Sequence, residues 1–431
     1  MTTFFLVCFI LLSYLLFGSH KHITPASIWT AGWLVLIILH AILPLGLTPL
    51  SDGAAVITGV GVTAFLIGYY FVKQPEVCSA PSTRQAPDIS HSRYAIGSGI
   101  LCLLLLYGLL SFQAGISAKA GMAYSSLDQV AIRRLQARGS DRSTGFGSIF
   151  IAIAPLVACW SIYGGLRIKK YWFSLLPFVF FVTLRSPSRT LTISVIMAGI
   201  VFYLYLRPRE QQFTNKLRLA FLLSSVGGTV LIYFQFVGNA LHKTNLTSKG
   251  LTPSWIPNYL ITPFIYELGG LSALSTTQIF GIDPVMGEQG RSVYIFYRFL
   301  AVFSNIKTPD TVADFVPIPL PFNVYTGFGD VWFDFGSLGV GIVFAAVGFI
   351  VAVVHRKART GDIKFVWLAA TILSVISGTP LTLRLFNVDV VVMAIIGIIA
   401  FQVVIVKNVK SRKSVAWHRT GIALESRQHA G

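Results

Sequence analysis

Residues 330–359 read DVWFDFGSLGVGIVFAAVGFIVAVVHRKAR. An apolar run that ends in a basic cluster is typical of a helix that crosses a bilayer and ends on the cytoplasmic side. Similar runs recur along all 431 residues, of which 54% are hydrophobic and only 12% charged. This composition excludes an ordinary soluble enzyme, a disordered chain and a fibrous protein. The sequence therefore predicts an all-α polytopic integral membrane protein.

A scan for apolar stretches of roughly 20 residues predicts about eleven transmembrane helices. The sixth of these spans is short, and Pro177 within it predicts a kink. The first span has no basic segment before it and no small-residue cleavage site, so we expect a retained helix. The expected spans are 2–17, 28–47, 54–72, 95–112, 147–166, 171–184, 190–206, 219–237, 330–354, 365–379 and 388–406.

The distribution of Lys and Arg predicts a periplasmic N-terminus and a cytoplasmic C-terminus. This orientation places the short basic connectors 167–170 and 355–359 on the cytoplasmic side. The chain then divides into an N-terminal membrane bundle (1–237, with an external loop at 113–146), a large external loop (238–329), a C-terminal bundle (330–406) and a basic cytoplasmic tail (407–431).

The large external loop is rich in aromatic residues, so we expect it to fold at the membrane surface rather than to be disordered. Within it, Ser292 to Val302 has the pattern of an amphipathic interfacial helix.

The formal net charge of +18 does not indicate a nucleic-acid partner. Cytoplasmic loops of membrane proteins collect Lys and Arg, and no basic helix or aromatic-basic module is present. The histidines are scattered, and the sequence contains no HExxH and no phosphate-binding glycine loop, so we expect neither a metal nor a cofactor. The cysteines show no paired spacing, so we expect no disulfide framework. They are Cys8, Cys78, Cys102 and Cys159.

Arginine is unexpectedly frequent on the predicted external side. A guanidinium group grips phosphate oxygens in bidentate fashion, so a converging cluster would bind a diphosphate or another polyanion. The alternative is that these side chains contact lipid headgroups or pair with external acids. The arginines are Arg133, Arg134, Arg138, Arg142, Arg185, Arg189, Arg291, Arg298 and Arg384.

Two carboxylates mark the start of the ninth span. Asp330 and Asp334 are four residues apart, so on a helix they share a face one turn apart. One of them could act as a general base or orient an acceptor hydroxyl. The alternative makes Asp330 a helix cap and Asp334 an arginine partner. Gly336 and Gly339 would allow close packing of helices.

The chain resembles bacterial O-antigen polymerases of the Wzy type. The resemblance rests on about eleven spans, the long external loop before the last three, the external arginines and two short stretches. These stretches are Asn323-Val-Tyr-Thr-Gly-Phe with Asp334-Phe-Gly-Ser-Leu-Gly, and Ser188-Arg189-Thr190. In topology the resemblance covers most of the chain, whereas in sequence it covers only these stretches.

This resemblance implies a GT-C-like integral membrane glycosyltransferase of the bacterial inner membrane. Such enzymes join oligosaccharide repeat units carried on undecaprenyl diphosphate at the periplasmic face, without metal or cofactor. Membrane lipids, a Wzz-type chain-length regulator and a Wzx-type flippase are the implied partners.

The implied site combines arginines, carboxylates and aromatic rings. Arginines stabilise the lipid diphosphate leaving group, and Asp334 or Asp330 serves the acceptor hydroxyl, with Glu267 as a reserve. The expected arginines are Arg189, Arg291, Arg298 and Arg384. Expected substrate-binding residues are Arg134, Arg138, Arg185 and Glu267, with Tyr325 and Trp332 stacking on sugar rings.

Three other functions remain open. An O-antigen ligase is associated with an essential His in the large loop, where this chain offers only His242. A flippase or another transporter usually shows internal repeats, broken helices or charges near the midplane, which the sequence does not reveal. A non-enzymatic polysaccharide assembly factor is the third.

Overall fold

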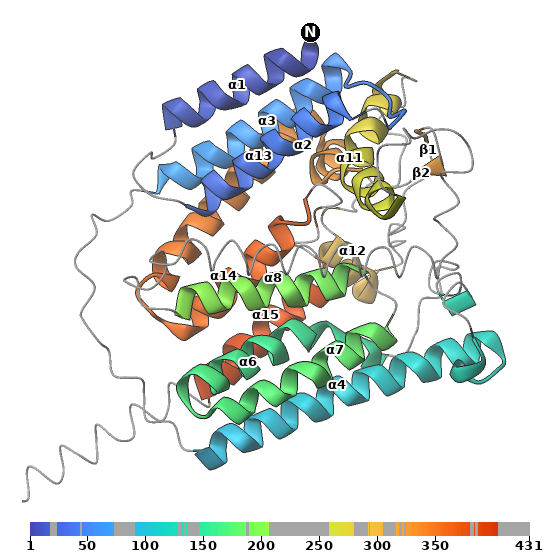
Figure 1. Cartoon of the computed structure of the whole chain (residues 1–431), viewed down its shortest axis with the longest axis vertical. Coiled ribbons are helices and arrows are strands. Elements are labelled where there is room, and N and C mark those ends of the chain that lie inside the picture. The colour runs from blue at the N-terminus through green and yellow to red at the C-terminus, as the bar shows by residue number, and fades with distance from the viewer. Residues whose placement is uncertain are drawn as a thin grey trace, which may run out of the picture.

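The computed structural model shows a bundle of apolar helices (Figure 1). It describes residues 1–17, 24–43, 45–72, 91–127, 131–132, 135, 146–186, 189–206, 258–279, 292, 294–304, 316–318, 321–322, 325–379, 383 and 387–403.

Each of the other ten expected spans overlaps at least one described helix, and the span expected at 219–237 lies outside the described residues. The helices are α1 (Thr2–Phe17), α2 (Pro25–Ile42), α3 (Asp52–Phe71), α4 (His91–Ala120), α6 (Ala154–Arg167), α7 (Leu175–Arg185), α8 (Arg189–Leu206), α11 (Asn258–Ile279), α12 (Tyr294–Phe303), α13 (Gly327–Ala358), α14 (Ile363–Ile376) and α15 (Val388–Phe401). Shorter 3-10 turns are η1 (Tyr124–Ser126), η2 (Phe146–Ile153) and η3 (Lys170–Ser174). One antiparallel pair of two-residue strands joins β1 (Val316–Pro317) to β2 (Pro321–Phe322).

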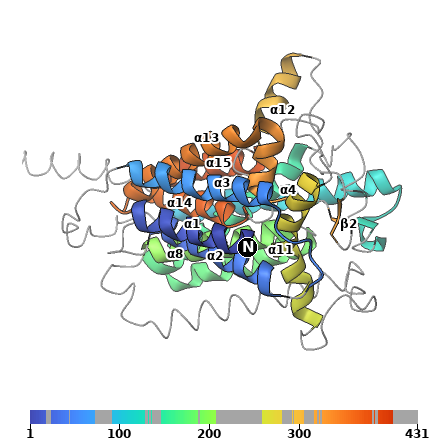
Figure 2. The ribbon, with the colours of Figure 1, turned by 90° about the horizontal axis from the view of Figure 1, so that it is seen from above.

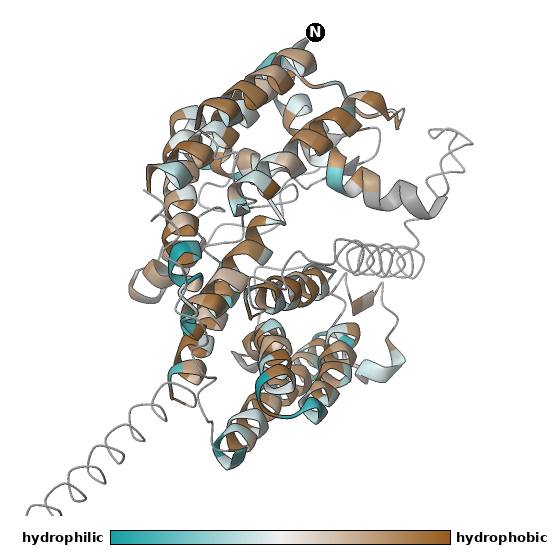
Figure 3. Cartoon of the chain, turned by 60° about the vertical axis from the view of Figure 1, so that its left-hand side comes forward, coloured by the Kyte–Doolittle hydropathy of each residue, from teal (hydrophilic) through white to brown (hydrophobic). Residues whose placement is uncertain are grey.

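The helices have the length and composition of a membrane protein. Among the described residues, five helices are long and apolar enough to cross a bilayer, and four shorter apolar helices accompany them. Figure 3 shows that hydrophobic residues dominate the helices throughout. The chain is therefore a helical membrane protein, while the number of eleven spans stays a prediction.

Local sequence explains where two of the helices begin. Thr24 caps α2 by accepting a hydrogen bond from the Ser27 backbone N–H, and Pro25 fills the first helical position. Pro177 lies in the first turn of α7, directly after η3, where its missing N–H has no intrahelical partner to lose. The span predicted at 171–184 therefore changes from a 3-10 turn to an α-helix just before the proline.

The tightest helix pair is α3 with α13, and glycines make it possible. A Cβ atom on Gly68 would lie 1.9 Å from the Ala345 carbonyl oxygen, and one on Gly348 would lie 2.1 Å from the Phe65 carbonyl oxygen. Small residues of this kind let backbones approach closely in membrane bundles. Figure 1 places α1, α2 and α3 on one side of the bundle and α4, α6, α7 and α8 on the other. Because α13 also packs against α14, it links the two sides.

The predicted ninth span is not one continuous helix, because α13 bends back sharply at Gly336. This residue has φ 65° and ψ −171°, a conformation that only glycine adopts readily. The rings of Phe328 and Phe344 lie 4.5 Å apart, whereas one straight helix would separate the two residues by about 24 Å. We call 327–335 the short segment and 337–358 the long segment.

The reversal also corrects the role predicted for two glycines. Gly336 supplies the backbone conformation, and a Cβ atom on it would meet nothing within 4 Å. A Cβ atom on Gly339 would lie 2.0 Å from the Cβ atom of Phe335, within the same corner. These glycines therefore form the bend within α13 rather than a contact with another helix.

The segment predicted as a large external loop contains α11, α12 and the strand pair. These elements gather at one end of the bundle, on the same side as the N-terminus of the chain (Figures 1 and 2). The helix α12 falls where the amphipathic helix was predicted, within two residues at its start and one at its end. At the same time, α4 continues to Ala120, so it takes up the first part of the loop predicted at 113–146.

Candidate active site

The N-terminus of the short segment is buried in the bundle and is held there by several hydrogen bonds. The Thr326 hydroxyl caps the helix by accepting from the Gly329 backbone N–H at 3.1 Å. The Gly327 backbone N–H donates to the Thr379 carbonyl oxygen at 2.7 Å, and the Trp29 indole N–H donates to the Thr379 hydroxyl at 3.1 Å. Residues from α2, α13 and the end of α14 thus meet at this point. Because Thr326 is the cap, the alternative in which Asp330 caps the helix is wrong.

The Asp330 carboxylate is almost fully buried and binds a distant stretch of backbone. Its Oδ2 atom accepts a hydrogen bond from the Leu383 backbone N–H at 3.1 Å. Leu383 follows α14, so the carboxylate fixes the connection between α14 and α15.

The Asp334 carboxylate, one turn further along, binds Ser292, which lies two residues before α12. Its Oδ2 atom accepts hydrogen bonds from the backbone N–H of Ser292 at 2.7 Å and from the Ser292 hydroxyl at 2.5 Å. Asp334 is only partly buried. The predicted arrangement on one helix, one turn apart, is confirmed, because both carboxylates lie in the helical short segment.

Two segments far apart in the sequence therefore converge on the short segment. Ser292 and Leu383 bind carboxylates separated by about 6 Å of helical rise. Each also neighbours a predicted site arginine in the sequence: Arg291 precedes Ser292, and Arg384 follows Leu383.

Glu267 is a third carboxyl of this region. It lies on α11, which is not among the helices apolar enough to cross a bilayer. Its neighbours Ile265 and Leu268 share an apolar cluster with Phe333, the residue before Asp334. Burial raises the pKa of the Glu267 carboxyl to about 7. A carboxyl that remains partly exposed and titrates near neutral pH has the properties of a general acid or base.

The two aromatic residues predicted to stack on sugars are buried. Tyr325 is 5% exposed, and its ring makes an edge contact with Phe333 at 5.0 Å between centroids. Trp332 is 8% exposed and also packs against Phe333, at 5.2 Å. Both rings belong to the packing that holds the short segment, so this structure does not present them to a sugar.

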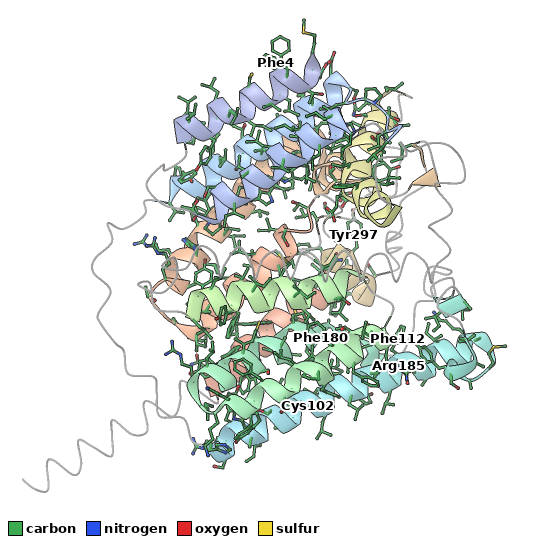
Figure 4. The ribbon with its side chains drawn as sticks, in the orientation of Figure 1. Phe4, Cys102, Phe112, Phe180, Arg185 and Tyr297 are labelled. Carbon is green, nitrogen blue, oxygen red and sulfur yellow. The ribbon has the colours of Figure 1, made fainter. Side chains whose placement is uncertain are left out.

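Arg185 is the predicted arginine whose side chain the structure describes. It is the last residue of α7, is exposed and places its guanidinium 5.5 Å from the Phe181 ring centroid. Its carbonyl oxygen accepts a hydrogen bond from the Tyr124 hydroxyl at 2.6 Å. Figure 4 shows Arg185 and Tyr297 toward the same end of the bundle.

The other predicted arginines lie partly or wholly outside the described residues. The backbones of Arg189 and Arg298 belong to the described parts of α8 and α12, but their side chains do not. Outside altogether are Arg133, Arg134, Arg138, Arg142, Arg291 and Arg384, together with His242.

A buried histidine and serine form a pair that the sequence did not reveal. The His40 Nε2 atom lies 2.8 Å from the Ser272 hydroxyl, which itself donates to the Thr48 carbonyl oxygen at 2.9 Å. The single hydroxyl proton of Ser272 goes to the Thr48 carbonyl oxygen, so the His40 ring donates to the Ser272 oxygen. His40 therefore does not activate Ser272 as a nucleophile. The pair therefore fastens α11 to α2 and to the turn before α3. Their separation by more than 200 residues leaves no signal in the sequence.

The described part of the chain contains neither a cluster of metal ligands nor a disulfide bond. Throughout those ranges, no group of three or more His, Cys, Asp or Glu is close enough to hold a metal ion. Cys8, Cys102 and Cys159 are free thiols, and Cys78 lies outside the described residues.

Comparison with known proteins gives no relative from which a function could be transferred. No family model, no curated protein and no solved structure matches the chain. The site must therefore be interpreted from its own chemistry.

Proposed function

We propose that this protein polymerises oligosaccharide repeat units carried on undecaprenyl diphosphate, at the periplasmic face of the bacterial inner membrane. One observation carries the proposal: the backbone segments that border Arg291 and Arg384 are tied to one short helix by Asp334 and Asp330. The segment before α12 and the segment after α14 would thereby bring Arg291 and Arg384 together beside these two carboxylates. Such a site suits a diphosphate leaving group and a sugar hydroxyl.

The proposed reaction is a glycosyl transfer between two lipid-linked chains. The bond between the growing glycan and its lipid diphosphate breaks, and the diphosphate leaves with the bonding electrons. A hydroxyl of the new repeat unit forms the glycosidic bond and gives its proton to a carboxylate. Arginine side chains stabilise the developing charge on the diphosphate, in the manner of an oxyanion site.

The structure changes our preference among the three carboxylates. Asp330 and Asp334 each accept hydrogen bonds from backbone N–H groups, so we assign them positioning roles. Glu267, the reserve candidate of the sequence analysis, becomes the proposed base because burial raises its pKa to about 7. The protonated carboxyl must then release this proton to water before the next transfer.

Deletion of the gene in its native host tests the proposed activity. Surface polysaccharide is separated on a silver-stained gel, with a parallel assay for capsule or exopolysaccharide. Collapse of the ladder to a single repeat unit supports a polymerase. Loss of all capped species while lipid-linked polymer accumulates indicates a ligase instead, and intact polymers in both assays refute the proposal.

The arginine roles predict a large and specific loss of activity. Complementation of the deletion strain with Arg189→Ala or Arg384→Ala should abolish polymerisation while protein levels stay unchanged. Lysine at either position should restore little, because it cannot form a bidentate contact with phosphate. Arg93→Ala, at the other end of α4 from the external elements, is the control and should leave the ladder intact. Near-normal chain lengths in both alanine variants would remove these arginines from the site.

One observation favours a transporter as the second candidate. Broken helices whose ends meet inside a bundle are frequent at the binding sites of secondary transporters. Here the N-terminus of the short segment meets Thr379 after α14, and α13 breaks at Gly336. Purified protein in vesicles distinguishes the two functions: movement of lipid-linked oligosaccharide across the membrane without chain extension would indicate transport.

A further inference from the structure

The helix α12 carries an exposed apolar stripe that no described part of the bundle covers. Its exposed residues are 46–74% accessible and follow the spacing i, i+3, i+4, i+7, which places them on one face. They are Phe296, Phe299, Leu300 and Phe303. Large aromatic residues on one helical face are typical of helices that lie in the membrane interface.

The direction of α12 suits this interpretation. In Figure 2, α12 projects out of the bundle, across the direction of α3 and α13. If the long apolar helices cross the bilayer, a helix with this orientation lies along its surface. α12 lies at the end of the bundle that also carries α11 and the strand pair (Figures 1 and 2).

The start of α12 is hydrogen-bonded to a helix whose exposed surface lipid must cover. Phe335 and Leu338, on either side of the corner of α13, are 48% and 78% exposed. Further along the long segment, Ile342 and Phe349 are exposed as well. The long segment has 22 residues, enough for about 33 Å of helix, so its exposed face contacts the hydrocarbon region. Ser292, bound to Asp334 directly before this corner, brings the start of α12 to the same surface.

We propose that α12 is a lipid-binding anchor that lies in the outer boundary of the bilayer. The partner that this surface fits is the lipid of the surrounding leaflet, contacted by the stripe of Phe296, Phe299, Leu300 and Phe303. The hydrogen bonds between Ser292 and Asp334 couple this anchor to the short segment of α13. The inference rests on the membrane-spanning character of the bundle and not on the proposed reaction.

Depth-dependent fluorescence quenching tests the anchor directly. The full chain, with its four cysteines replaced, receives one cysteine at Phe299→Cys or, as a control at the exposed polar residue just beyond the end of α12, at Ser304→Cys. Each is labelled with an environment-sensitive fluorophore in phosphatidylcholine–phosphatidylglycerol vesicles. We expect lipids with a quencher near the headgroup to reduce the emission at position 299 at least twofold more than at position 304. Aqueous iodide should show the opposite order.

Two results would overturn the proposal. Strong iodide quenching without lipid quenching at position 299 would mean that the stripe lies in water, and quenching by neither would mean that protein covers it. If the cysteine-free chain does not fold, a photoreactive phenylalanine at position 299 of the unmodified chain replaces the label. Adducts with lipid then support the anchor, and adducts with protein alone refute it. Neither measurement depends on polymerisation.

Discussion

Glu267→Gln is expected to lower the rate of polymerisation by about 10²–10⁴-fold, because it removes the proposed proton acceptor. Since burial raises the pKa of this carboxyl to about 7, the rate of the parent protein should rise with pH through about 7 and level off above it. The assay uses purified protein and lipid-linked repeat units extracted from the deletion strain, over pH 5 to 9. Asp52→Asn is the control. Asp52 is the exposed first residue of α3, and its carboxylate accepts a hydrogen bond from the Thr2 hydroxyl.

The same substitution should stabilise the protein at alkaline pH. A carboxyl whose pKa is raised by folding contributes stability below its ordinary pKa of about 4.5, and this contribution is lost as the pH rises past about 7. Glutamine cannot ionise, so the melting temperature of Glu267→Gln should exceed that of the parent at pH 8 and match it near pH 4. A variant that is both inactive and less stable at pH 8 would show that Glu267 has a structural role.

Gly336→Ala is expected to destabilise the protein strongly, because alanine is strained at φ 65° and ψ −171°. Forcing a non-glycine residue into such a region costs about 1–3 kcal/mol, even though a Cβ atom there would meet no neighbour. The short segment would then lose its alignment with α2 and α14. Thermal unfolding in detergent should show a lower melting temperature, with loss of polymerisation.

Gly32→Ala provides a matched control for the conformational effect. Gly32 lies within α2, and a Cβ atom on it would also meet nothing within 4 Å. In a helix interior, alanine is more favourable than glycine by about 0.5–1 kcal/mol, so the melting temperature should stay the same or rise. Equal melting temperatures for the parent and Gly336→Ala would show that the corner of α13 does not need its glycine.

The fold class could be predicted from the sequence because bilayer thickness imposes a length on apolar segments. The amphipathic pattern of α12 was equally readable, since spacing along one helix is a local property. The reversal at Gly336 could not be predicted, because the apolar run continues through it and a lone glycine has several uses. The backbone angles of Gly336 and the proximity of Phe328 to Phe344 reveal the bend.

The candidate site was predictable only in part. Sequence spacing placed Asp330 and Asp334 on one helical face, but their partners Leu383 and Ser292 lie about fifty and forty residues away. Such tertiary contacts leave no trace in local patterns. For the same reason, Tyr325 and Trp332 were expected to face a substrate and are instead buried beside Phe333.

The hydrogen bonds at Thr379 have a consequence for biosynthesis. Trp29 emerges early from the ribosome, Gly327 much later, and Thr379 later still, yet all three must meet to seat the short segment. Until residues 379–383 have been translated, the N–H of Gly327 and the carboxylate of Asp330 lack their final partners within the bundle. The centre of the molecule is thus completed near the end of translation, and a chain truncated before α14 would reach the membrane with its helices inserted but its core unassembled.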